Sequence, residues 1–305
     1  MDVITTEKPG VAGKANMKSK SAQHKAHGWS RLWQLAWLRR VVQLYFVLFI
    51  AKLVVEQAFV GENSTTLVPS AEAYCPFGGV ESLYRFVTSL GQTAPHTHWS
   101  NLVLFVSVLL VTLVTKSAFC SWICPFGTLQ EWLGALGRRF GLRKSVPPSI
   151  DRALRYLKYL VLIWATAGAA MTGTLVFRDW DPYHALIGIA EVGFAASTVV
   201  LVATMVASVF VERPWCKYAC PLGAIIGLLG HLSLVKVERV QSLCANCSLC
   251  DKRCPMGVNV STADRIGTAE CHNCLTCVEA CPKAALEPKF ISLSYLARGG
   301  KQSEA

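Results

Sequence analysis

The sequence predicts an α-helical membrane protein of four transmembrane helices that ends in a small, cysteine-rich α+β domain. The first observation is composition: the 305 residues are 52% hydrophobic and only 16% charged, which is too apolar for an ordinary soluble domain. The second is that four apolar stretches are long enough to cross a bilayer. The third is that twelve of the thirteen cysteines fall into tight C-x2-C and C-x3-C spacings, which suit metal binding better than disulfide bridges.

The four apolar stretches set the domain organisation. A hydrocarbon core of roughly 30 Å needs about 20 residues of helix. The predicted transmembrane helices cover residues 41–60, 101–119, 157–177 and 192–211. The resulting segments are a basic tail at 1–40, a membrane domain at 41–235, the cysteine-rich domain at 236–290 and a short tail at 291–305.

The charges between these stretches predict the orientation. Residues 1–40 hold eight Lys and Arg against two acids, and residues 116–158 hold the same numbers. Residues 61–100 and 178–191 each hold one basic residue against three acids. Because cytoplasmic loops carry the excess of Lys and Arg, we expect a multi-pass protein of the bacterial inner membrane with both termini in the cytoplasm.

The net charge of +11 does not indicate nucleic-acid binding. The basic residues lie in blocks beside apolar stretches and do not form one patch with interleaved aromatic residues. We therefore attribute the positive charge to the orientation of the chain in a membrane. We expect the lipid bilayer, and not nucleic acid, as a partner.

The cysteine-rich end carries the strongest motif of the chain. The spacing C-x2-C-x2-C-x3-C-P occurs twice in succession, first from Cys244 to Pro255 and again from Cys271 to Pro282. Iron–sulfur cubanes are held by four thiolates, and this run is typical of bacterial two-cluster proteins. Paired C-x2-C units also bind zinc, which is the alternative, but zinc sites do not need this eight-cysteine pattern.

The segment from about 240 to 290 resembles bacterial-type 2[4Fe–4S] ferredoxin domains. In such proteins the fourth cysteine of each run binds the other cluster. One predicted cluster therefore has the ligands Cys244, Cys247, Cys250 and Cys281. The other has Cys271, Cys274, Cys277 and Cys254.

A second pair of motifs, C-x3-C-P, follows the second and the fourth predicted spans. Cys120 and Cys124 precede Pro125, and Cys216 and Cys220 precede Pro221, in what reads as an internal duplication. Cysteines four apart lie on one face of a helical turn, so the two pairs could supply four thiolates at one level of the membrane surface. A third iron–sulfur cluster is one interpretation; structural thiols or a redox-active dithiol are the others.

These motifs, with four spans ahead of the two-cluster domain, resemble the NapH/NosR/YccM-type polyferredoxin-like membrane proteins over residues 40–285. The resemblance implies electron transfer that serves a periplasmic reductase or a maturation pathway, with the C-x3-C-P pairs on the cytoplasmic side. The flavin-binding domain that NosR-type proteins carry ahead of the first span is not found here, so we expect the shorter NapH-like or YccM-like architecture.

Three further residues are candidates for a functional role. Cys75 stands in a C-P-F-G element on the predicted periplasmic side, where an unpaired thiol could bind a metal, contact a partner or mark the exit point for electrons; a buried structural thiol is the alternative. Lys52 and Glu56 are four residues apart in the first span and can pair on one helix face. Ionisable residues inside a membrane are candidates for proton or quinone chemistry. Snorkelling to the membrane surface is the alternative.

The sequence therefore predicts a membrane-bound iron–sulfur protein that relays electrons. The donor would be a cytoplasmic protein or the quinone pool, and the acceptor a redox partner in the membrane or periplasm. No catalytic triad, paired carboxylates, P-loop or Rossmann fingerprint is found, which favours an electron carrier or redox subunit over a stand-alone enzyme. The alternatives are a maturation factor that supplies reducing power to another protein's metal centre and a thiol-based redox sensor.

Overall fold

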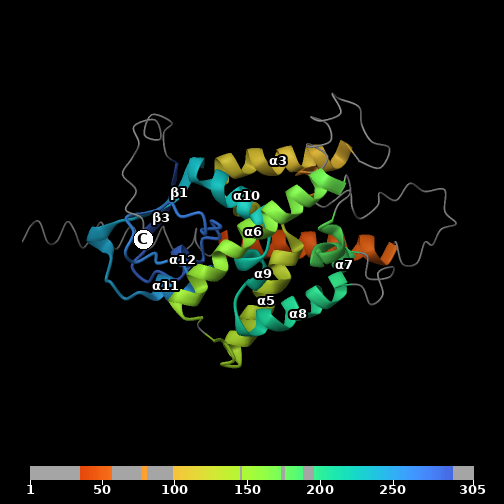
Figure 1. The fold of residues 1–305 in the computed structure, drawn as a ribbon. Coiled ribbons are helices and arrows are strands. Elements are labelled where there is room, and N and C mark those ends of the chain that lie inside the picture. The colour runs from red at the N-terminus through yellow and green to blue at the C-terminus, as the bar shows by residue number, and fades with distance from the viewer. Residues whose placement is uncertain are drawn as a thin grey trace, which may run out of the picture.

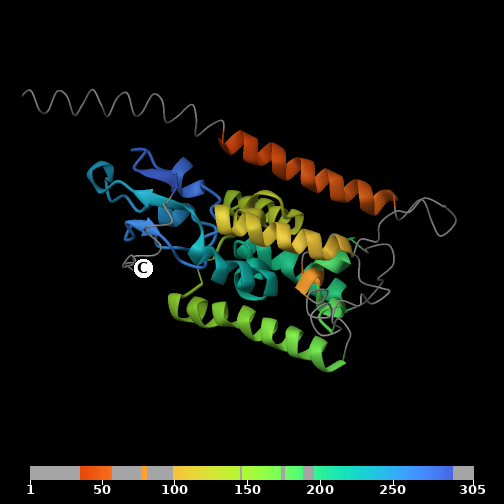
Figure 2. The ribbon, with the colours of Figure 1, turned by 90° about the horizontal axis from the view of Figure 1, so that it is seen from above.

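The computed structural model describes residues 35–56, 77–80, 99–144, 146–172, 176–187 and 196–290. Most of these residues are helical, and a small cysteine-rich α+β region follows them. Figures 1 and 2 show the long helices lying roughly side by side, with the α+β region at one end of the bundle.

A helix lies at each of the four apolar stretches of the sequence. Residues 35–56 are helical, and α3 (Trp99–Thr115), α6 (Pro148–Thr172) and α8 (Ala196–Phe210) follow. Residues 57–60, 173–175 and 192–195 of the predicted spans lie outside the described residues, as does nearly all of the tail at 1–40 and the whole tail at 291–305. Figure 2 shows the helix of residues 35–56 along one side of the bundle and α6 along the opposite side.

Across the described ranges, none of the helices is both long enough and apolar enough to traverse a bilayer.

Short helices connect the long ones. The connecting helices are α4 (Ala118–Trp122), α5 (Pro125–Arg139), α7 (Pro182–Ile187), α9 (Pro214–Tyr218) and α10 (Pro221–Leu229), with 3-10 turns at Arg178–Trp180, Gly230–Leu232 and Gln241–Leu243. All of these helices except α4 begin with proline, which is favoured at the first helical position because its missing N–H would have no partner there.

The α+β region is built on a three-stranded antiparallel sheet. Strand β1 (Val235–Arg239) lies between β2 (Arg265–Ile266) and β3 (Leu286–Phe290). Two single-turn helices accompany the sheet, α11 (Leu249–Arg253) and α12 (Thr276–Glu279). A buried cluster that includes Val237, Met256, Val260, Ile266 and Val278 fills the interior, and five of the cysteines pack against or within it. The structure thus confirms the predicted α+β character of the C-terminal region.

Buried cations tie this region to the helices. The Lys158 ammonium lies 2.6 Å from a carboxylate oxygen of Glu270. The Lys116 ammonium donates to the carbonyl of Ile266 at 3.3 Å. Burying such a charge is unfavourable unless it is paired, so these contacts hold the two parts in one defined arrangement.

The packing of α5 against α8 requires a glycine. A Cβ added to Gly137 would overlap the backbone carbonyl of Val209, because the two helices approach each other closely at this point. We expect Gly137→Ala to lower the free energy of unfolding, since overpacking against backbone costs roughly 3 kcal/mol and outweighs the gain of about 1 kcal/mol in helix propensity. Thermal unfolding followed by circular dichroism would measure the loss. Ala135→Ser, at an exposed position of the same helix, is the control, and equal midpoints for the two variants would contradict the packing argument.

Candidate metal centres

The two C-x3-C-P motifs adopt the same local structure. Cys124 and Cys220 are the N-cap residues of α5 and α10, with backbone angles of φ −62°, ψ 114° and φ −71°, ψ 113°. The amide of Cys124 donates to the carbonyl of Phe119 at 3.0 Å, and that of Cys220 donates to Trp215 at 2.9 Å. A residue before proline is pushed to extended angles, so each motif ends one short helix and starts the next at its second cysteine. The structure thus confirms the internal duplication.

All four cysteines of these motifs line one cavity of about 70 Å³. Cys120 and Cys216 are buried, and Cys124 and Cys220 are half-buried. This four-cysteine site therefore draws one half from each repeat, which the sequence could only suggest.

Aromatic rings form much of the wall of the four-cysteine site. The ring of Trp215 lies 6.5 Å from that of Phe126 and 6.3 Å from that of Phe177, and Phe177 lies 5.2 Å from Phe77. Such packing gives the cysteines a water-poor surrounding, which strengthens electrostatic interactions.

Residues from both predicted outer loops also line the four-cysteine site, although the sequence placed those loops on the opposite side of the membrane. Phe77 belongs to the C-P-F-G element after Cys75, and Asp181 starts α7 in the D-P-Y-H element. The amide of Tyr183 donates to Asp181 Oδ1 at 3.0 Å, which fixes that helix start. The outer elements thus reach inward to the cysteines. Cys75 itself lies outside the described residues.

Burial makes these thiols poor nucleophiles. Loss of water, with the neighbouring cysteines, raises the pKa of Cys120 and Cys220 well above the ordinary value, and burial raises that of Cys124 to about 11. A redox-active dithiol needs a lowered pKa, so its thiolate forms near neutral pH. The raised pKa values therefore disfavour a dithiol switch.

Polar donors reach two of the four sulfurs. The amide of Gly223 donates to Cys220 Sγ at 3.3 Å, and the side-chain amide of Gln130 lies 3.6 Å from Cys216 Sγ. Hydrogen bonds to sulfur are one means by which proteins stabilise an iron–sulfur cluster and set its potential. Four sulfur donors with N–H groups aimed at them fit a [4Fe–4S] group.

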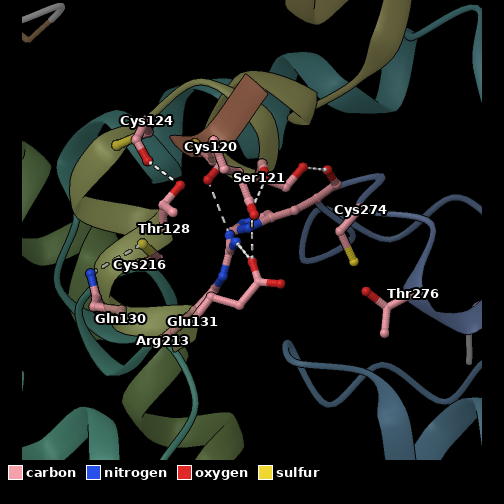
Figure 3. A network of polar contacts seen from close by, with 12 residues as sticks. Cys120, Ser121, Cys124, Thr128, Gln130, Glu131, Arg213, Cys216, Cys274 and Thr276 are labelled. Carbon is pink, nitrogen blue, oxygen red and sulfur yellow. Dashed lines mark hydrogen bonds and ion pairs between the residues drawn. The ribbon is translucent and has the colours of Figure 1, made fainter. Parts of the chain in front are cut away.

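An ion triad lies beside the four-cysteine site, and Figure 3 shows two of its members, Glu131 and Arg213. Glu131 pairs with Arg213 on one side and with Arg39 on the other. Arg213 also donates to the carbonyl of Cys120 at 3.1 Å, and Arg39 donates to the carbonyl of Cys274 at 3.1 Å. Although burial opposes the charge, the two guanidinium groups lower the pKa of Glu131, so it is ionised at neutral pH.

The thiols of the ferredoxin-like cysteines lie close enough to influence one another. The electrostatic neighbours of the buried Cys277 thiol are Cys274, Cys271, Cys254 and Cys250. Burial and the Cys274 and Cys271 thiols raise the pKa of Cys254 to about 12. Cys281 in turn influences Cys250, whose pKa is raised chiefly by burial. Because Cys277 has neighbours in both predicted ligand sets, the crosswise assignment stays a prediction.

Backbone amides also point at the sulfurs of this region. Val258 N–H donates to Cys254 Sγ at 3.4 Å, and Ala285 N–H donates to Cys281 Sγ at 3.3 Å. The two loops share their shape, since Asn246 and Asn273 have φ of 50° and 49°. The region therefore also fits clusters on donor chemistry. In the described part of the chain, no three His, Cys, Asp or Glu side chains converge as a site for a single metal ion.

The remaining sequence candidates lie elsewhere. Lys52 and Glu56 approach to 3.3 Å on the first helix, which confirms their predicted pairing, and both side chains are exposed. Arg39, Glu131, Arg213 and His272 were missed by the sequence analysis. No motif marks these residues, and only the position of His272 within a C-x2-C unit is a signal.

Two family descriptions match the chain. The 4Fe-4S binding domain matches residues 97–143 and 192–239, one segment for each C-x3-C-P repeat. The 4Fe-4S dicluster domain matches residues 236–282. No solved structure matches the chain at a significant level.

Several known proteins are similar along much of the chain. YccM of Escherichia coli, named as a candidate electron transport protein, is 34% identical over 73% of this chain and 65% of its own length. The ferredoxin-type protein NapH of the same organism is 28% identical over 58% of this chain and 63% of NapH. NirI of Paracoccus denitrificans is 27% identical over 81% of this chain and 40% of NirI. The chain thus spans less than two thirds of each relative.

The fold and the two groups of cysteines define a ferredoxin-type iron–sulfur protein. Within that class, the chain belongs to the YccM/NapH/NosR-type ferredoxin-like proteins.

The ion triad gives a test of what holds the site together. Glu131→Gln leaves the buried cations Arg39 and Arg213 without their shared anion, and breaking a buried pair costs roughly 3 to 5 kcal/mol. We expect a lower thermal midpoint and faster proteolysis between the helices and the α+β region. Asp179→Asn removes the same charge at an exposed position and is the control. A Glu131→Gln protein as stable as this control would show that the triad is dispensable.

Proposed function

We propose that this protein is a membrane-bound electron carrier that relays electrons between a cytoplasmic or quinone-pool donor and an acceptor in the membrane or periplasm. One observation carries the proposal. The four-cysteine site lies directly against the loop of Cys271 and Cys274, so the three groups of cysteines form a continuous series through the protein. The description of YccM as a candidate electron transport protein supports the same function.

The proposed cofactors are two [4Fe–4S] clusters in the dicluster region and a third in the four-cysteine site. Such a cluster, when bound, takes up and releases single electrons. In the dicluster region the ligands would be the two crosswise sets of four cysteines. Cys120, Cys124, Cys216 and Cys220 would hold the third cluster, for which both repeats of the 4Fe-4S binding domain supply cysteines.

The protein's own residues would set the properties of these groups. The Arg213 guanidinium beside Cys120 places a buried positive charge next to the four-cysteine site, which favours the added electron. The aromatic wall keeps water from the sulfurs. Gln130 and the amide of Gly223 orient the sulfurs they contact. No residue in this account transforms a substrate.

We further propose that the long helices lie in the bacterial inner membrane with both termini in the cytoplasm. Large apolar side chains are exposed on all four of them, including Leu48 on the helix of residues 35–56 (59% exposed), Val103 on α3 (62%), Leu160 on α6 (62%) and Val199 on α8 (63%). Exposed apolar surface of this extent is typical of contact with lipid or with partner proteins. Quinone and redox partner proteins could therefore approach from within the membrane.

Iron quantitation tests the cofactor proposal. Protein purified without oxygen should contain about twelve irons, since each cubane holds four, and Cys120→Ser with Cys216→Ser should lower the number to about eight. Ser107→Ala, on the exposed face of α3, should keep the full number. About eight irons in the unmodified protein would contradict the third cluster. Zinc in place of iron would contradict the whole assignment.

Reporter fusions test the topology. Green fluorescent protein fused after residue 305 should fluoresce, because it would fold in the cytoplasm, and alkaline phosphatase fused after residue 187 should be active, because it would reach the periplasm. The converse pattern, or release of the protein from membranes by an alkaline carbonate wash, would contradict the proposed location.

A further inference from the structure

The second cysteine loop of the dicluster region is clamped to the helical part at consecutive residues. The Ser121 hydroxyl donates to the carbonyl of His272 at 2.9 Å, and the Asn273 side chain donates to the carbonyl of Thr115 at 3.0 Å. Arg39 holds the next carbonyl, that of Cys274. Ser121 directly follows Cys120, so the clamp ties the loop to one of the four cysteines through a single hydrogen bond.

His272 of this loop lines the four-cysteine site. It is 5% exposed and lines the cavity together with the four sulfurs. Its Nδ1 atom is buried and has no hydrogen-bond partner among the described residues. A buried ring nitrogen without a partner is unfavourable, so its position calls for a group in the cavity that it can contact.

The first cysteine loop shows that the fold does not require this histidine. Asn246 and Ser248 have φ of 50° each, and their counterparts Asn273 and Leu275 have 49° and 61°. At the position of His272 the first loop carries Ala245, which is exposed. The backbone therefore accepts a small side chain here, and the imidazole serves the cavity that only the second loop faces.

We propose that His272 links the dicluster region to the four-cysteine site, with its imidazole hydrogen-bonded to a sulfur of the cluster held by Cys120, Cys124, Cys216 and Cys220. The inference rests on the third cluster of the proposed function. His272 is a positioning residue and not a ligand of the four-cysteine site. Its backbone belongs to the loop of Cys271 and Cys274, so one residue joins the ligands of one cluster to the sulfur of the next.

The chemistry of the cavity supports sulfur as the acceptor. Its remaining wall is mainly aromatic and aliphatic, and Asp181 already accepts the amide of Tyr183 through Oδ1. A cluster with four thiolates carries negative charge that a donated hydrogen bond stabilises, most of all in the reduced state. Removing the bond should therefore lower the reduction potential of this cluster.

An EPR-monitored redox titration of the full-length protein, purified without oxygen, tests the inference. The relevant signal is the one lost in the Cys120→Ser, Cys216→Ser protein. In His272→Ala we expect an unchanged iron content and a lower midpoint potential for this signal, with smaller shifts in the other two clusters. His272→Asn, which places an amide nitrogen near the position of Nδ1, should recover part of the shift. Ala245→His, the matched change in the exposed first loop, should alter no potential.

The outcomes separate the two proposals. About twelve irons with an unchanged potential in His272→Ala would overturn the role of His272 and leave the third cluster standing. A shift confined to the dicluster signals would also overturn it. Loss of four irons in both His272→Ala and His272→Asn would show a ligand in place of a positioning residue. About eight irons in the unmodified protein would overturn both proposals.

Discussion

The arrangement of this protein depends on one half-buried carboxylate shared by two buried arginines. Glu131 on α5 joins Arg39 on the first helix and Arg213 ahead of α9, and the same arginines grip the carbonyls of Cys274 and Cys120. An uncompensated charge would be very costly in this interior, so the three chain segments must come together as a set. The four-cysteine site and the dicluster loop are thereby held at a fixed separation, as electron exchange between neighbouring centres requires.

The surroundings of the cysteines follow a consistent physical logic. Burial and mutual repulsion raise the pKa of the C-x3-C-P thiols, so an empty site would be protonated and unreactive. A metal cluster reverses this balance, because its irons compensate the thiolates and the nearby N–H groups are already directed at sulfur. The same reasoning disfavours the redox-sensor alternative, which needs an activated thiol.

Local spacing made part of this structure predictable. The repeated C-x2-C-x2-C-x3-C-P run predicted the α+β region. The repeat of the C-x3-C-P motif at Cys120 and Cys216 predicted the internal duplication, which the matching backbone angles confirm. The ion triad escaped prediction, because Arg39 lies 92 residues from Glu131 and 235 from Cys274, and no local pattern reports such contacts. The inward fold of Phe77 and Asp181 escaped for another reason: loop charges assign a side of the membrane but not a depth.

The position of His272 also has a consequence for how the molecule is assembled. The dicluster loop contributes His272 to the wall of a cavity whose two pairs of cysteines precede and follow α6 in the chain, so the four-cysteine site becomes complete only when the end of the chain has been made and docked. The full surroundings of a cluster bound there would therefore form last in biogenesis.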